Sequence, residues 1–529
     1  MIMMTRYRSF ITFLNCWFLC GLSASSNQPK PNIILIVADD LGWNDVSFHG
    51  SSQIPTPHLD ELAYNGIILS NYYVSPICTP TRGALMTGRH PIHLGLQHET
   101  IHPAAPYGLP LNETTIATAL KGLGYKTHMV GKWHLGFFED VYTPINRGFD
   151  SHIGYYSGKE DYYNHCNDED GWLGYDFFKD GTPYKPTFGQ YSTEIYTQAA
   201  EDIIRNHSKN QSEPLFLYFA HQSVHSANND QPLQVPDRYL EKFKDIHHEG
   251  RRTYAAMVSI LDESVQNLTE TLKDVGMLNN SVIIFTSDNG GPANGFDVNF
   301  ASNFPLRGVK ATLWEGGVRG AAFVHSPLIK SSPRISNGMF HVCDWFPTFI
   351  DIGGGDPSKF SNLDGTSQWP SLKSGTKSPR TEILHNIDPI YNVSALRWMD
   401  FKVIIGDTYQ GNWSGWYPPE QVTGIFSEEA DPRALVVQCP NKPSNASTNC
   451  NPFKAPCLYN ITHDPCEYFN IANENPDVVK SLLDKLEKYQ STMIPPGNKP
   501  IVEAANPYLH GGNWEPWVEP DMTVVKLRP

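Results

Sequence analysis

Short apolar runs alternate with longer amphipathic stretches through most of the chain. The clearest run covers residues 32–38, and it is continuous and rich in β-branched side chains. Such a run is typical of a parallel strand that is covered on both faces. Similar short runs occupy residues 126–130, 215–219 and 282–285. The pattern therefore predicts four buried strands.

Helical periodicity fills intervals between these strands. It predicts helices at residues 115–122, 193–206 and 253–274. Alternating strands and helices are typical of an α/β fold, in which helices cover both faces of a mostly parallel sheet. We predict this fold class for the main part of the chain.

The pattern changes after about residue 378. Residues 395–398 and 401–405 predict a hairpin, and residues 458–461 predict a further strand of the same small sheet. The last residues, rich in Pro, Gly and Trp, resemble a tail laid across the surface. A small antiparallel sheet is therefore expected near the C-terminus.

A helix is predicted to begin at Pro476, with Asn475 as its N-cap. Its apolar positions form one stripe that is typical of packing against a core: Val479, Leu482, Leu483, Leu486 and Tyr489. A chain of 529 residues exceeds one ordinary core. We predict a main domain at 26–378 and a C-terminal domain at 379–529 made of the small sheet and this helix.

Polar side chains follow each of the four predicted strands. Asp39 and Asp40 follow the first, and Asp288 and Asn289 follow the last. The two strands between them are followed by positively charged or imidazole side chains: Lys132, His134, His221 and His225. Ligands of open α/β sheets bind beyond the carboxyl ends of the strands. The sequence therefore predicts one site at this edge.

The carboxylate and amide groups at this edge predict a metal site. Asp39, Asp40, Asp288 and Asn289 offer hard oxygen ligands, which select calcium or magnesium over zinc. We find no second set of metal ligands beside Asp288 in the sequence. This disfavours a phosphatase or phosphodiesterase that uses two zinc ions.

The stretch 78–89 predicts a helix that begins at a cysteine. Pro80 suits a first turn, and Gly88 can end the helix. Cys78 would then lie at a helix N-terminus, which favours an anion, with the positive charge of Arg82 one turn on. A buried structural cysteine is the alternative interpretation.

Cys78-x-Pro80-x-Arg82, followed by Gly83 and Thr87-Gly88-Arg89, resembles the signature of the sulfatase family. The run 306–319 resembles the family segment that carries a substrate-binding lysine, here Lys310. The resemblance extends from about residue 31 to the C-terminus and is closest to the arylsulfatase B (N-acetylgalactosamine-4-sulfatase) branch. It implies an alkaline-phosphatase-like fold. It also implies that a formylglycine-generating enzyme oxidises Cys78 to formylglycine in the endoplasmic reticulum.

The resemblance also assigns site residues. The implied catalytic residues are Cys78, Arg82, Lys132, His134, His225 and Lys310. The implied ligands of one calcium ion, with magnesium as the alternative, are Asp39, Asp40, modified Cys78, Asp288 and Asn289. The resemblance favours His225 over His221, and we interpret His221 as structural.

The implied function is hydrolysis of sulfate monoesters by an arylsulfatase-type enzyme. Aryl sulfates, sulfated sugars and small sulfated glycosides such as glucosinolates stay open as substrates. The loops at 226–231 and 292–305 look longer than those of the family, which leaves the recognised group undecided. Two alternatives are a phosphate-ester hydrolase of the same superfamily and an inactive protein that binds sulfated glycans.

The N-terminus predicts entry into the secretory pathway. Residues 1–25 combine early arginines, a short apolar core and small residues, as in a cleaved signal peptide. No later stretch has about 18 uninterrupted apolar residues, so we expect no stable membrane span. Nine sequons suit a glycoprotein: Asn112, Asn206, Asn210, Asn267, Asn279, Asn392, Asn412, Asn445 and Asn460. A lysosomal and an extracellular location both stay open, as does the oligomeric state.

Cysteine spacing and net charge complete the sequence-based picture. Outside the predicted signal peptide and Cys78, six cysteines remain, and four of them cluster within 439–466. At least one local disulfide is expected there, because the spacing lacks the CxxC pairs of a zinc site. The state of Cys166 stays open. The formal net charge of −15 argues against nucleic acid as a partner.

Overall fold

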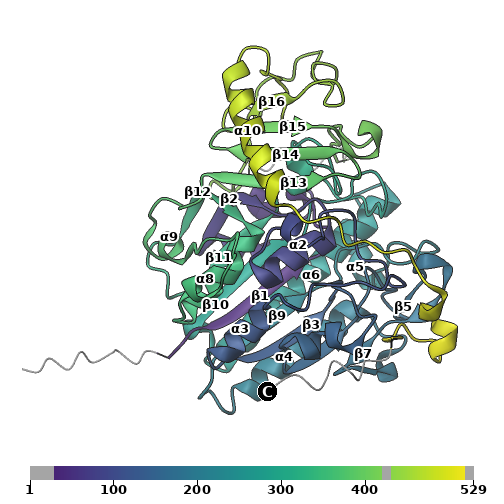
Figure 1. Cartoon of the computed structure of the whole chain (residues 1–529). Coiled ribbons are helices and arrows are strands. Elements are labelled where there is room, and N and C mark those ends of the chain that lie inside the picture. Colours follow the sequence, from purple (N-terminus) through teal and green to yellow (C-terminus); the bar gives the residue numbers. More distant parts are fainter. Residues whose placement is uncertain (1–28, 420–429, 519–529) are drawn as a thin grey trace, which may run out of the picture.

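The computed structural model describes residues 29–419 and 430–518, so the predicted signal peptide lies outside the described residues. The main sheet has ten strands in the order β12-β2-β11-β10-β1-β9-β3-β4-β7-β8 (Figure 1). Their bounds are β1 (Asn32–Ala38), β2 (Ile67–Tyr73), β3 (Lys126–Gly131), β4 (Ser151–Gly154), β7 (Phe178–Lys179), β8 (Thr182–Pro183), β9 (Leu215–Ala220), β10 (Ser281–Ser287), β11 (Ala322–His325) and β12 (Arg334–His341).

The four strands predicted from apolar runs are neighbours at the centre of this sheet. β10, β1, β9 and β3 lie side by side and are all parallel. In this register Val37 of β1 pairs with Thr286 of β10 and with Ala220 of β9. The residues that follow these strands therefore emerge together at one edge. Antiparallel pairing is confined to β11, β7 and β8, so the prediction of a mostly parallel sheet is confirmed.

Helices cover both faces of the sheet, which explains why residues 33–37 of β1 are apolar at every position. Ile33 and Leu35 of β1 join one core cluster, whereas Ile34 and Ile36 join the other. The first cluster includes side chains of α2 (Cys78–Thr87), α3 (Ile116–Gly122) and α8 (Trp345–Ile352). The second includes side chains of α1 (Pro57–Tyr64), α4 (Ser192–His207) and α6 (Glu249–Asp274).

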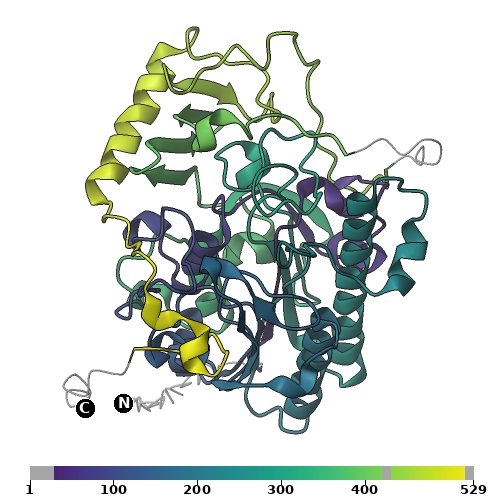
Figure 2. The same ribbon diagram turned by 90° about the vertical axis from the view of Figure 1, so that its right-hand side faces the viewer.

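A small antiparallel sheet lies at one end of the molecule (Figure 2). Its strands are β13 (Glu382–Asp388), β14 (Val393–Trp398), β15 (Phe401–Ile405) and β16 (Cys457–Asn460). The predicted stripe of α10 (Pro476–Thr492) packs on this sheet, with Leu482 and Leu486 buried. The sequence analysis missed β13. Asn475 is the N-cap residue of α10, as predicted, but its side-chain amide donates to the carbonyl of Ile471 and makes no capping hydrogen bond.

The segment after α10 returns along the main sheet to the opposite end of the molecule (Figures 1 and 2). The backbone N–H of Ile494 donates to Ile92 O at 2.9 Å, and that of Trp514 donates to Tyr175 O at 2.9 Å. Trp514 is fully buried in the main core. The predicted surface tail thus contributes a core side chain, and the domain boundary at 378/379 stays a prediction.

Two disulfides join the four clustered cysteines, Cys439 to Cys466 and Cys450 to Cys457. The prediction of a local bridge is confirmed. Cys166 and Cys343 are free thiols, as is Cys78. Among the described residues, none of the helices combines the length and the apolar character needed to cross a membrane.

Candidate active site

Three carboxylates and two cations meet where β1 and β10 end. Asp39 follows β1, Asp288 follows β10, and both are fully buried. The guanidinium of Arg82 donates to Asp288 Oδ2 at 2.8 Å, and Lys132 Nζ donates to Asp39 Oδ2 at 2.7 Å. The backbone N–H of Asp40 donates to Asp288 Oδ1 at 3.2 Å. Strand register therefore brings together side chains that lie about 250 residues apart in sequence.

Cys78 is the first residue of α2, as predicted. Its Sγ lies 3.9 Å from Asp39 Oδ1, and the residue is buried. Burial raises the pKa of this thiol, so the unmodified side chain is not a thiolate nucleophile. Its place at the helix start nevertheless directs the side chain toward the carboxylates and Lys132.

Lys310 and His225 form the opposite side of the cluster. Lys310 Nζ donates to Asp40 Oδ2 at 2.8 Å and to His225 Nε2 at 3.1 Å. His225 Nδ1 contacts Ser226 O at 2.6 Å, which assigns the ring proton to Nδ1 and leaves Nε2 as the acceptor. Asp297 Oδ2, which the sequence analysis missed, accepts from Lys310 Nζ at 3.1 Å. Lys310 therefore links a carboxylate of the sheet edge to the imidazole.

His134 presents an unused nitrogen to the same site. Its Nε2 lies 3.2 Å from Ile101 O, whereas its buried Nδ1 has no hydrogen-bond partner. Burial, with Lys132 as the next cause, lowers the pKa of His134 well below its usual value. The neutral ring can therefore accept a proton at Nδ1.

Burial sets the charge of the cluster. Burial, and next the facing Asp288, raises the pKa of Asp39, and burial raises that of Asp40. Burial acts to raise the pKa of Asp288, but Arg82, Lys132 and Lys310 together outweigh it and hold that pKa below its usual value. Carboxylates crowded in this way need further positive charge to be ionised together.

Non-glycine residues with left-handed backbone gather at this site. The angle φ is 56° at Asp40 and His134, 53° at Asp297 and 68° at Ala311 beside Lys310. Each such residue costs on the order of 1–3 kcal/mol and persists where the surroundings over-determine it. The site is thus held in its shape at a cost to stability.

The carboxylates of this cluster and the side chains beside them fit a divalent cation. Ligand atoms of Asp39, Asp40, Cys78 and His225 lie within 4.8 Å of one another. Asn289 donates to Asp40 Oδ1 at 2.6 Å, and its buried Oδ1 has no hydrogen-bond partner. An orphaned amide oxygen beside crowded carboxylates is the arrangement that a hard cation satisfies. The donor set therefore fits a divalent cation, and its identity as calcium or magnesium stays a prediction.

A pocket of about 220 Å³ opens onto this cluster. Cys78, His134, His225 and Lys310 line it. Around them lie residues that the sequence analysis missed: Glu99, Lys159, Glu169, Phe296, Asp297 and Tyr409. The unusual length of the loop at 292–305 was the one signal, because it carries Phe296 and Asp297. The other residues come from irregular segments without a recognisable pattern.

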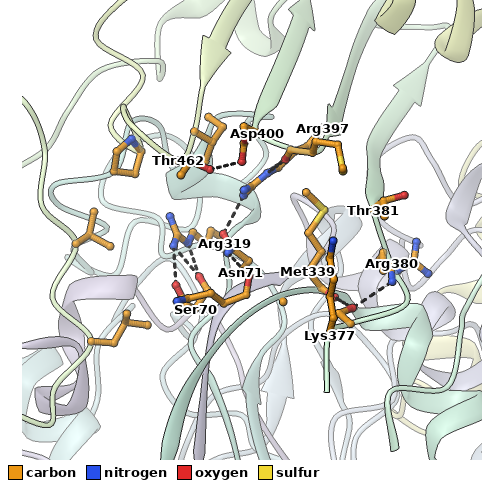
Figure 3. Close-up of a pocket in the computed structure, with 18 of the residues that line it drawn as sticks. Ser70, Asn71, Arg319, Met339, Lys377, Arg380, Thr381, Arg397, Asp400 and Thr462 are labelled. Carbon is orange, nitrogen blue, oxygen red and sulfur yellow. Dashed lines mark hydrogen bonds between the residues drawn. The ribbon is translucent and has the colours of Figure 1, made fainter. Parts of the chain in front are cut away.

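A second, larger cleft lies between the main and small sheets. It has a volume of about 600 Å³ and is lined by several cations, including Arg319, Lys377 and Arg397 (Figure 3). Arg319 donates to Ser70 O at 2.6 Å, and Arg397 donates to Asn71 Oδ1 at 2.9 Å (Figure 3). These guanidinium groups are already bound by protein oxygens, so size alone does not make this cleft the functional site.

Comparisons with known proteins agree with the geometry of the smaller pocket. The family model described as Sulfatase matches residues 31–355. Arylsulfatase J of Mus musculus is 41% identical over 516 residues, which covers 94% of this chain and 81% of that protein. N-acetylgalactosamine-6-sulfatase of Homo sapiens is 28% identical over 516 residues, covering 93% of this chain and 90% of that protein.

A crystal structure of Ps i-CgsB in complex with k-i-k-neocarrahexaose has a similar fold. Its TM-score is 0.72 at 28% sequence identity, and the match covers 91% of this chain and 98% of that chain. The chain belongs to the sulfatase family and is a sulfuric ester hydrolase. The predicted family, fold class and enzyme class are confirmed, whereas the arylsulfatase B branch stays a prediction.

Contacts connect nine of the ten predicted site residues, and the tenth, His134, lines the same pocket. Their individual roles stay predictions. His221, interpreted as structural, is buried away from the pocket lining, and its Nε2 lies 3.1 Å from Ser264 Oγ. Family membership implies a formylglycine and a divalent metal.

Proposed function

We propose that this sulfatase cleaves sulfate monoesters in the pocket at Cys78, after that residue has been converted to formylglycine. The observation that carries the proposal is the position of Cys78 Sγ at a helix start, 3.9 Å from Asp39 Oδ1. When formed, the hydrated aldehyde supplies the hydroxyl that attacks sulfur, and the divalent cation supplies positive charge beside it. The remaining steps belong to side chains of this chain.

Lys132 and Lys310 are positioned to bind the sulfuryl oxygens. Both ammonium groups are buried and already contact carboxylates of the cluster. Cations fixed in a dry pocket stabilise negative charge that develops in the transition state, usually the largest single catalytic effect. Arg82, held by Asp288, adds a fixed positive charge at the base of the pocket.

Proton transfer is divided between the two histidines. His134 Nδ1, which is buried without a partner, accepts the proton of the second hydroxyl at position 78. Loss of this proton from the hydroxyl expels sulfate. Lys310 Nζ and His225 Nε2, 3.1 Å apart, act as a pair that delivers a proton to the leaving oxygen. Because neutral His225 carries its proton on Nδ1, the ammonium of Lys310 is the proton source of the pair.

We propose calcium as the cation, with magnesium as the alternative. The ligands offered by Asp39, Asp40, Asp288 and Asn289 are oxygens, and His225 Nε2 accepts from Lys310. Elemental analysis of purified protein should show about one calcium or magnesium per chain. Stoichiometric zinc without either of them would refute the assignment.

We propose that the enzyme acts in the lysosome or outside the cell, after modification by the formylglycine-generating enzyme. Eight of the nine sequon asparagines are exposed, Asn460 being half-buried, which supports passage through the secretory pathway. The substrate belongs to the aryl sulfates, sulfated sugars or small sulfated glycosides. No described feature decides the oligomeric state.

One experiment tests the central proposal. Mass spectrometry of the peptide that contains residue 78 should show an aldehyde in active, secreted protein. The same preparation should hydrolyse a sulfate ester much faster than the matched phosphate ester. A fully active enzyme with an unmodified thiol at position 78 would overturn the mechanism, and preference for the phosphate would overturn the assigned substrate class.

A further inference from the structure

The side chains around the catalytic cluster differ in charge with depth. The residues at the base of the pocket, Cys78, His134, His225 and Lys310, are all buried. The half-buried residues of the same lining include three carboxylates: Glu99, Glu169 and Asp297. The pocket therefore presents the ammonium of Lys310 where a sulfate group would bind, and carboxylates where the rest of the substrate would lie.

The lysines and His102 of the described lining are already paired with carboxylates. Lys159 Nζ pairs with Asp168 at 2.9 Å, and His102 Nδ1 contacts Asp170 at 3.0 Å. Lys310 is engaged by Asp40 at the base and also by Asp297 at 3.1 Å. Glu99, by contrast, accepts from the neutral hydroxyl of Tyr391, so a second negative charge on a substrate would face a carboxylate that is not paired with these cations.

The uncharged part of the wall is aromatic. Phe296 and Tyr409 line the pocket, and Trp413 stacks on Tyr409 with ring centroids 3.8 Å apart. Tyr391 lies against Tyr409 at 5.5 Å and donates its hydroxyl to Glu99. Flat apolar faces pack against sugar or aryl rings, and carboxylates accept hydrogen bonds from hydroxyl groups.

The size of the pocket limits the ligand further. Its volume of about 220 Å³ is below the range of about 300–1,000 Å³ that is typical of sites for drug-sized ligands. The space suits a sulfate group and about one ring rather than several sugars of a chain.

We propose that the substrate is a small neutral ring compound with a single sulfate, and that Glu99 excludes substrates that carry a second negative charge. This inference rests on the proposed function of the pocket. Specificity of this kind comes from repulsion of the wrong substrate and not only from contacts with the right one. Glu99 is suited to the role because it lines the pocket and accepts from the hydroxyl of Tyr391 rather than from a residue of the catalytic cluster.

The test uses two aryl sulfates that differ in one charge, the sulfates of 7-hydroxycoumarin-3-carboxamide and 7-hydroxycoumarin-3-carboxylate. The measured quantity is the ratio of kcat/KM for the amide to kcat/KM for the acid. Wild type should clearly favour the amide. Glu99→Gln should lower this ratio by about five- to tenfold, as expected for loss of one like charge at close range in a partly screened site.

Glu99→Gln is a conservative change, because an amide oxygen can still accept the hydrogen bond from Tyr391. Glu99→Asp keeps the charge and should retain most of the discrimination. Glu270→Gln, an exposed site on α6, changes the net charge equally and should leave the ratio unchanged. Raising the salt concentration should lower the ratio in wild type more than in Glu99→Gln.

The outcomes separate the two proposals. If wild type hydrolyses no sulfate ester, the proposed function of the pocket fails. If it hydrolyses sugar sulfates but neither coumarin sulfate, the sulfatase mechanism stands and the proposed substrate is wrong. If it hydrolyses both with equal kcat/KM, or if Glu99→Gln leaves the ratio unchanged, the sulfatase mechanism stands and the role of Glu99 is wrong.

Discussion

The two clefts of this protein hold similar side chains but differ in how those side chains are satisfied. In the larger cleft between the sheets, Arg319 and Arg397 donate to Ser70 O and Asn71 Oδ1. Arg319 Nη1 is nevertheless buried without a hydrogen-bond partner. In the smaller pocket, two acceptors beside crowded carboxylates, Asn289 Oδ1 and His134 Nδ1, are buried without partners. A buried unsatisfied polar atom costs about 1–3 kcal/mol, and a bound ligand can offset that cost.

The charge networks under the two clefts show the same contrast. Beneath the larger cleft, Lys402 Nζ pairs with Glu315 Oε1 and with Glu467 Oε1, each at 2.9 Å. This network closes on itself and joins the small sheet to the main one. In the smaller pocket, crowded carboxylates leave room for an added cation. Crowded carboxylates with unpartnered acceptors beside them, rather than volume, mark the functional site.

The largest difference in kcat between variants of the two clefts is expected when the nucleophile is removed. Cys78→Ala should lower kcat by about 10⁴-fold or more, because no other group can supply the attacking hydroxyl. Lys377→Ala, an exposed cation of the larger cleft, should leave kcat within twofold. Steady-state kinetics on an aryl sulfate measures both. Equal losses in the two variants would remove the distinction between the clefts.

A second variant tests the Lys310–His225 pair. His225→Ala should slow hydrolysis of a sugar sulfate by about 10²–10⁴-fold, the usual contribution of general acid–base catalysis. An aryl oxygen leaves readily without a proton, so the loss on nitrocatechol sulfate should be much smaller. Comparable losses on both substrates would show that His225 does not assist Lys310 in delivering the proton.

Arg397 tests whether the larger cleft is structural. Its guanidinium is buried and binds Asn71 Oδ1 and the hydroxyl of Tyr73. Arg397→Leu should lower the free energy of unfolding by about 1–3 kcal/mol, because it orphans these acceptors. The kcat of the remaining folded enzyme should be unchanged. Thermal unfolding followed by kinetics at low temperature measures both, and a large loss of kcat with intact stability would give this cleft a functional role.

The smallest effect concerns pH. Burial, opposed by Lys402 and aided by Glu315, raises the pKa of Glu467 to about 7. A carboxyl whose pKa is raised on folding contributes stability below its unfolded pKa of about 4.3, and this contribution is lost as the pH rises toward 7. The midpoint temperature of thermal unfolding should therefore decrease as the pH rises from about 4.5 to 7.

Glu467→Gln should flatten part of this slope while leaving stability at low pH nearly unchanged. The pH-dependent loss of unfolding free energy should be smaller in Glu467→Gln than in wild type by about 1–3 kcal/mol, since one unit of pKa is about 1.4 kcal/mol. Some slope should persist, because burial also raises the pKa of Asp262 to about 7 and that of Asp176 to about 6. A variant with the wild-type slope would show that Glu467 does not titrate in this range.

The sequence by itself determined the central sheet and the type of chemistry at its edge. Continuous apolar runs identify strands that are buried on both faces, and the residues after parallel strands must emerge at one edge. This is why Asp39, Lys132, His225 and Asp288 could be grouped before the fold was known. The start of α2 at Cys78 was also predictable, because helix termini follow local rules.

Tertiary structure alone decided what surrounds that chemistry. Glu99, Asp297 and Tyr409 lie in irregular segments, where no periodicity reports which way a side chain points. The fold also decided that Trp514 fills the main core, since only long-range packing brings the final segment back to the first sheet. Local patterns are set by backbone geometry and by burial of one face, whereas the walls of a pocket depend on contacts between segments that are distant in sequence.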